Sequence, residues 1–88
     1  MLAVMNEYQL KIAKRIRDIR KDKKISQEML SNMSGVSYAS IRRFESSGEI
    51  SLSSLVEIAL VLGLKDDLDN LFNKEGNFLS IEEIIEER

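Results

Sequence analysis

The sequence predicts an all-α fold, in which five short helices form one compact domain and a further short helix lies near the C-terminus. Apolar residues recur at the i, i+3 and i+4 spacing of helices with one buried face, and no segment alternates as a strand does. The chain has four glycines and no proline, so glycine is the main punctuation between helices. Its 88 residues, 43% of them apolar, suffice for one small domain of marginal stability.

The first two helices lie in the basic half of the chain. The first is expected from about Asn6 or Glu7 to Asp22, with its apolar face made by Ile12, Ile16 and Ile19. Ser26 is a candidate N-cap of the second helix. The core residues of that helix would be Met29, Leu30 and Met33. Gly35 would then supply the positive φ that a sharp stop requires.

The third helix would begin after the N-cap Ser37 and turn Ile41 and Phe44 inward. The fourth begins after the N-cap Ser51 and carries a stripe made by Leu52, Leu55, Ile58, Ala59 and Leu62. A short fifth helix, near Asp66 to Phe72, would close the domain with Leu68, Leu71 and Phe72.

The C-terminal segment carries its own helix signal. Ser80, Glu82 and Glu83 fit a capping box, which predicts a short helix over residues 80–88. Nine residues are too few for a stable isolated helix, so we expect Ile81, Ile84 and Ile85 to pack on this domain, on a second copy or on another protein. We therefore divide the chain into residues 1–73, the main domain, and residues 74–88, a loop and acidic helix of the same unit.

Charge is distributed unevenly along the chain. Residues 1–48 hold 10 Lys/Arg and 5 acidic residues, a net charge of +5, whereas residues 49–88 hold 3 and 10, a net charge of −7. This asymmetry is typical of a protein with one face for nucleic acid and another that repels it. The alternative is two solvated helix surfaces of opposite sign.

The residue types that are missing exclude several kinds of site. The chain has no Cys and no His, so disulfides, Cys/His metal sites and a histidine base are excluded. No nucleophile–base pair or glycine-rich phosphate loop is present, and we expect neither an enzyme nor a cofactor. The apolar runs are too short to cross a membrane, and the start does not resemble a signal peptide, so a cytoplasmic, nucleoid-associated protein is expected.

Two short helices joined by a turn with glycine are typical of the helix-turn-helix, whose second helix enters the major groove of DNA. The candidate DNA contacts are Gln27, Ser37, Tyr38, Ala39, Ser40, Arg42 and Arg43. The two arginines can bind guanine edges or phosphate, and the first turn of the third helix can approach bases. Gln27 and Ser37 open helices, whose N-termini attract phosphate. The alternatives are ordinary solvated arginines, a half-buried Tyr38 and a purely capping Ser37.

Residues 16 to about 63 resemble the Xre/Cro-type helix-turn-helix family, which has the lambda repressor-like fold. The resemblance rests on Gln27, Leu30, Gly35, Val36, Ile41 and Glu45, with further matches in the first and fourth helices. Two departures are Ser31, where alanine is usual, and Ser34, where an apolar residue is usual; both predict slightly weaker packing. The resemblance implies a buried ion pair between Arg20 and Glu45.

A narrower resemblance, over Arg42 to Phe72 and the segment Ser80 to Ile85, is to the HipB-like antitoxins encoded beside HipA-type kinase toxins. The first hypothesis, from the Xre/Cro-type helix-turn-helix, is a homodimeric repressor that reads a palindromic operator in double-stranded DNA. The narrower resemblance implies that this operator is the one of its own toxin–antitoxin operon. A second hypothesis is a partner-binding module that neutralises a HipA-like kinase toxin through its acidic half, with DNA binding secondary. A third is a phage-type repressor or a restriction-control regulator.

Overall fold

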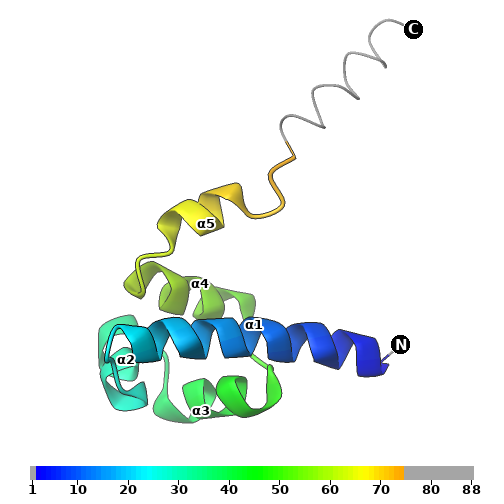
Figure 1. Cartoon of the computed structure of the whole chain (residues 1–88). Coiled ribbons are helices and arrows are strands. Elements are labelled where there is room, and N and C mark those ends of the chain that lie inside the picture. The colour runs from blue at the N-terminus through cyan, green and yellow to red at the C-terminus, as the bar shows by residue number, and fades with distance from the viewer. Residues whose placement is uncertain (1, 75–88) are drawn as a thin grey trace, which may run out of the picture.

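The structure is a computed structural model, which describes residues 2–74 and is all-helical over that range. The five helices of this described part are α1 (Leu2–Asp22), α2 (Gln27–Ser34), α3 (Tyr38–Ser47), α4 (Leu52–Val61) and α5 (Lys65–Asn70). In Figure 1 the long α1 lies between α3 and α4, α2 packs at one end, and α5 lies beyond α4. The helix predicted over residues 80–88 lies outside the described residues, as do Ile81, Ile84 and Ile85.

One core holds α1 to α4 together. Helix α1 packs against α3, α2 packs against both α3 and α4, and α4 packs against α5. The buried cluster consists of Ala13, Ile16, Leu30, Val36, Ile41, Phe44, Ile58 and Leu62. It takes residues from every helix except α5. The predicted inward faces of α3 and of the second half of α4 are therefore confirmed.

The three serine N-caps are also confirmed. Each serine has an extended backbone, and its hydroxyl accepts a hydrogen bond from the backbone N–H three residues later. Ser26 caps α2, Ser37 caps α3 and Ser51 caps α4. Because such bonds satisfy N–H groups that have no partner within the helix, they fix where each helix begins.

Helix α1 begins at Leu2, earlier than predicted, because nothing in the sequence before Asn6 breaks a helix.

Several predicted core residues are in fact exposed. The methionines predicted for the core, Met29 and Met33, are 47% and 52% exposed. The eight-residue α2 packs against α3 and α4 but buries only Leu30. Ile12, predicted on the apolar face of α1, is 42% exposed.

The predicted closure of the domain by α5 is wrong. Leu71 and Phe72 are exposed, Phe72 to 86%, and Leu68 is half-buried. Helix α5 has only six residues and packs mainly against α4, which leaves Leu71 and Phe72 without a second helix to cover them. Leu52 is likewise 71% exposed, because it begins α4 at the edge of the bundle.

The two serines that depart from the family pattern form hydrogen bonds across the α2–α3 turn. Ser31 Oγ donates to the carbonyl of Val36 at 2.7 Å, and Ser34 Oγ accepts from the N–H of Val36 at 3.1 Å. Val36 is itself buried in the core. Both backbone polar groups of Val36 are thus satisfied by hydroxyls, so the serines supply polar bonds where apolar residues would supply packing.

Gly35 and Gly48 end α2 and α3 in the same left-handed conformation, with φ of 76° and 81°, but their surroundings differ. A Cβ built on Gly35 meets nothing within 4 Å. A Cβ on Gly48 would lie 2.7 Å from Gln9 Cβ and 2.8 Å from the Gln9 backbone carbon. The backbone of α1 therefore approaches the end of α3 closely at Gly48.

We expect Gly48→Ala to destabilise the protein more than Gly35→Ala. A left-handed alanine lowers the free energy of unfolding by about 1–2 kcal/mol in either variant. Gly48→Ala should lower it by about 1–3 kcal/mol more, because the α1 backbone must move away from the new methyl group. Thermal unfolding of the two variants measures the difference. Equal melting temperatures would show that α1 yields at Gln9 without cost.

Candidate nucleic-acid interface

The outer face of α3 carries the residues predicted to contact DNA. Tyr38, Ala39, Arg42 and Arg43 are exposed, opposite the buried Ile41 and Phe44. Ser37 and Ser40 lie at the start of α3, where Ser37 Oγ donates to Ser40 Oγ at 2.8 Å and accepts from the Ser40 N–H at 3.1 Å. Ser37 therefore has a capping role whether or not it also meets a phosphate.

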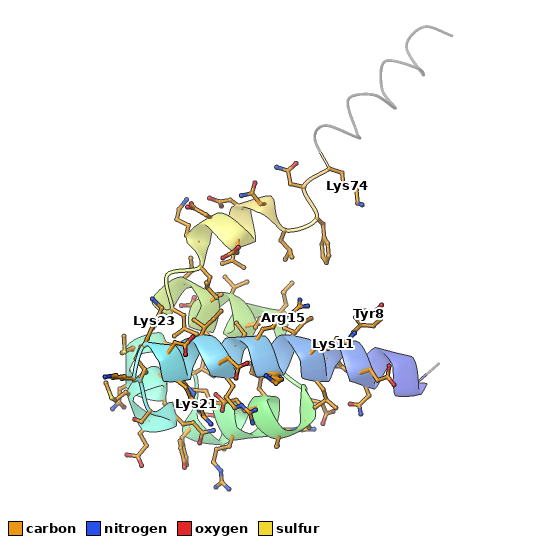
Figure 2. The ribbon with its side chains drawn as sticks, in the orientation of Figure 1. Tyr8, Lys11, Arg15, Lys21, Lys23 and Lys74 are labelled. Atoms are coloured by element: carbon orange, nitrogen blue, oxygen red, sulfur yellow. The ribbon has the colours of Figure 1, made fainter. Side chains whose placement is uncertain are left out.

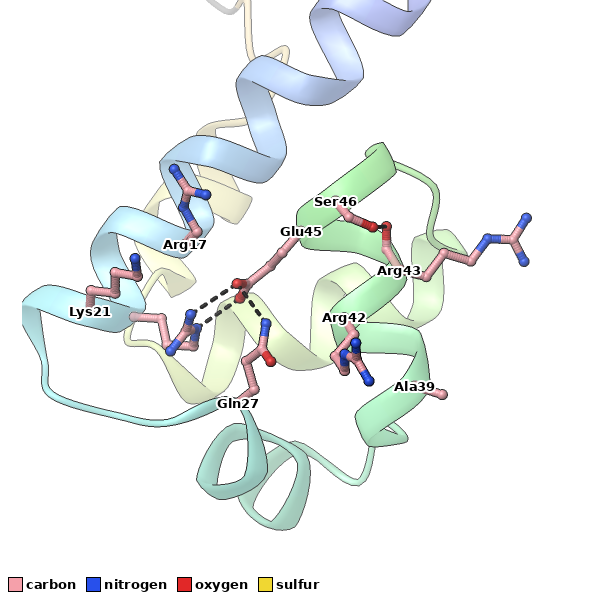
Figure 3. A pocket seen from close by; sticks show the side chains of 9 residues that line it. Arg17, Lys21, Gln27, Ala39, Arg42, Arg43, Glu45 and Ser46 are labelled. Atoms are coloured by element: carbon pink, nitrogen blue, oxygen red, sulfur yellow. Dashed lines mark hydrogen bonds and ion pairs between the residues drawn. The ribbon is translucent and has the colours of Figure 1, made fainter.

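The two neighbouring arginines of α3 are held differently. The Arg42 guanidinium stacks over the Tyr38 ring, 5.6 Å from its centroid, one helical turn away. Arg43 instead forms an ion pair with Glu49, whose Oε2 lies 3.1 Å from Arg43 Nη2. Both side chains of that ion pair are more than half exposed, so the pair contributes little to stability. Arg43 can therefore leave Glu49 for another anion at little cost. In Figure 3 Arg43 points away from the rest of the site.

Arg20 of α1 and Glu45 of α3 form a bidentate ion pair. Arg20 Nε and Nη2 donate to the two Glu45 oxygens at 2.8 and 2.9 Å, and Arg20 Nη1 donates to the Ile25 carbonyl at 2.8 Å. The side chains are only 9% and 6% exposed. Every charge in the pair is therefore hydrogen-bonded, as a buried ion pair requires.

Gln27 opens α2 and joins this network. Its amide nitrogen donates to Glu45 Oε1 at 3.0 Å, so Glu45 receives bonds from two residues (Figure 3). The sequence predicts Gln27 as a phosphate ligand, but in the structure its amide N–H donates to Glu45 instead. What Gln27 still offers toward a phosphate is its place at the N-terminus of α2.

A cleft between α1 and α3 brings these groups together. It has a volume of about 660 Å³, and its lining includes Arg17, Arg20, Lys21, Gln27, Ala39, Arg42, Arg43, Glu45 and Ser46 (Figure 3). We call it the α1/α3 cleft. Five cationic side chains and one carboxylate line it, and Glu45 is already satisfied by Arg20 and Gln27. The cleft is therefore suited to a polyanion.

The sequence-based site omitted Arg17 and Lys21. Both lie on α1, and with Arg20 they follow the i, i+3, i+4 spacing that puts side chains on one helix face. That spacing is visible in the sequence. What the sequence could not show is that this face of α1 borders α3, because Lys11, Lys14 and Arg15 are an equally basic set on the same helix.

The part of the chain that the structure describes offers few other kinds of site. Residues 2–74 contain no group of three or more acidic, His or Cys residues placed to hold a metal ion. None of the described helices has the length and apolar character needed to cross a membrane.

A family model described as helix-turn-helix matches residues 16–68, more than half of the chain. The chain belongs to this Xre-type helix-turn-helix family. It is accordingly a DNA-binding transcription regulator, and the predicted Xre/Cro resemblance is confirmed. No curated protein and no solved structure matches the chain.

The helix-turn-helix match begins at Ile16, so the first two-thirds of α1 lies outside it. The N-terminal end of α1 extends past α3 and α4 in Figure 1, and this part of the helix carries the exposed Tyr8, with Lys11 Nζ 5.1 Å from its ring centroid. The HipB-like resemblance is narrower than this family and stays a prediction.

Proposed function

We propose that the protein represses transcription by placing α3 in the major groove of an operator. The observation that supports this most directly is the outer face of α3. There Arg42 stacks on Tyr38 and borders the cationic α1/α3 cleft. An arginine held over an aromatic ring loses less freedom when it binds a guanine edge. Phosphates beside the groove would meet the N-termini of α2 and α3 and the cations of the cleft. Such a protein acts where the DNA is, so we place it on the nucleoid in the cytoplasm.

We further propose that two copies read a palindromic site. Two α3 helices about 34 Å apart would enter successive major grooves on one face of the duplex. A protein contact through α4 and the segment after α5 is supported by exposed apolar residues there, namely Leu60, Leu71 and Phe72. Burial of these side chains would also add stability to a domain of this size.

The proposed operator is that of the protein's own operon. The support is the resemblance of Arg42 to Phe72 to HipB-like antitoxins, which favours a toxin–antitoxin setting with a HipA-like kinase as partner. A role mainly in toxin neutralisation is supported by the exposed acids Asp66, Asp67 and Asp69 beside Leu71 and Phe72. Co-purification with the product of an adjacent kinase gene tests that role. A phage-type or restriction-control setting would leave the DNA mechanism unchanged.

Fluorescence anisotropy with DNA from upstream of the gene, beside an unrelated duplex, tests the repressor function. We expect tight binding to the upstream duplex, weakening steeply between two salt concentrations. Sedimentation of the complex should give two chains per duplex. Equal, weak binding to both duplexes would overturn the proposal of a specific operator.

A further inference from the structure

Helix α1 contains an arginine whose buried donor has no partner among residues 2–74. The Nε–H of Arg17 is buried, and it alone among buried side-chain polar atoms of the described residues has no hydrogen-bond partner. An unpaired buried donor carries a desolvation cost, which an acceptor in the bound state would remove. The neighbouring Arg20 shows the contrast, because its Nε donates to Glu45.

The surroundings of Arg17 fit an anion. Arg17 lines the α1/α3 cleft together with Lys21 and Arg42. Glu45, the only carboxylate among the described residues that line the cleft, accepts its hydrogen bonds from Arg20 and Gln27. Asp18, next to Arg17 in the chain, accepts a hydrogen bond from Lys14 at 2.7 Å, and this bond holds the pKa of Asp18 below its usual value. The charges of Arg17 and Lys21 also lower the pKa of Asp18, but among the described residues neither they nor Arg42 form an ion pair with a carboxylate.

The position of the cleft in the domain indicates which anion would bind there. Figure 3 shows Arg17 and Lys21 on one side of the cleft, Arg42 and Ala39 of α3 on the other, and Gln27 at the start of α2 between them. If α3 lies in the major groove, the strand beside the groove passes over the N-terminus of α2 and hence over the mouth of this cleft. A backbone phosphate is the anion that arrives there.

We propose that the α1/α3 cleft is a binding site for one DNA backbone phosphate, with Arg17 as its main ligand and Lys21 as its second. The proposal rests on the proposed function, since it extends the DNA contact from α3 to α1. Arg17 then contributes affinity without reading sequence, and it fixes how α3 is oriented in the groove.

Arg17→Ala tests the assignment, with Arg15→Ala as the matched control. Arg15 is exposed, carries the same charge and lies about 200° around the helix from Arg17. Figure 2 places Arg15 on the side of α1 away from Lys21. We expect Arg17→Ala to weaken binding to the upstream and the unrelated duplex by a similar factor, about 5- to 10-fold, and to lower the salt slope by about one. Arg15→Ala should change affinity less than about twofold.

Two results would overturn the phosphate site. One is an Arg17→Ala protein that binds both duplexes as Arg15→Ala does; the other is loss of affinity only for the upstream duplex, which would make Arg17 a base reader. Circular dichroism of each variant controls for folding. If the wild-type protein binds no duplex, the proposed function fails, and the cleft is tested by itself through the Arg17 Nε–H NMR resonance. A shift with inorganic phosphate, but not with chloride at equal ionic strength, would support an anion site, and no shift would overturn it.

Discussion

Operator binding is expected to be lost when Arg42 and Arg43 are both replaced by alanine, while the fold stays intact. The two side chains are exposed on the outer face of α3 and contribute nothing to the buried core. A good arginine–guanine pair is worth about 1–3 kcal/mol, so losing both contacts should weaken binding by about 100-fold or more. Anisotropy with the upstream duplex measures the loss, and circular dichroism measures the fold.

The single variants should separate the two arginines. Arg42 stacks on Tyr38 and borders the cleft, so Arg42→Ala should account for most of the loss. Arg43 has to leave Glu49 before it can bind DNA, and Arg43→Ala should cost less. A matched control is Lys11→Ala with Arg15→Ala on α1, which removes the same charge from exposed positions; Lys11 lies against Tyr8, and Arg15 lies on the side of α1 away from Lys21 (Figure 2). If that control weakens operator binding as much, the α3 arginines act only through net charge.

Local features of this fold could be predicted from the sequence, and tertiary ones could not. A serine N-cap acts on a backbone N–H only three residues away, so Ser26, Ser37 and Ser51 were identified from the sequence alone. Whether an apolar residue is buried depends on which helix lies against it. Met29, Met33, Leu71 and Phe72 were misassigned to the core for that reason.

The candidate site shows the same division. The outward face of α3 follows from helical periodicity, since Ile41 and Phe44 fix the inward face. The contact between Arg20 and Glu45, 25 residues apart in the chain, has no local signal and was expected only from the family resemblance. The sequence shows that Arg17 shares a helix face with Arg20 and Lys21, but the importance of Arg17 depends on the packing of α1 against α3 and on a donor left unpaired there, which have no local signal.

Glu45→Ala is expected to be the most destabilising single substitution at the site. It would leave the Arg20 guanidinium buried without its carboxylate and Gln27 without its acceptor. Breaking a buried pair from one side costs about 3–5 kcal/mol, which is a large share of the stability of so small a domain. A melting temperature lower by tens of degrees is expected, at about 4–8 °C for each kcal/mol.

Two further variants show whether burial is the cause. Glu49→Ala breaks the exposed pair with Arg43 and should cost about 1 kcal/mol or less. Replacing the whole buried pair, with Arg20→Met and Glu45→Leu together, should recover much of the stability lost in Glu45→Ala, because no unpaired charge stays buried. A Glu45→Ala protein that melts like Glu49→Ala would show that the pair does not hold α1 against α3. Glu45→Ala also makes the cleft more positive, so any loss of DNA affinity in this variant must come from the displaced helices and not from charge.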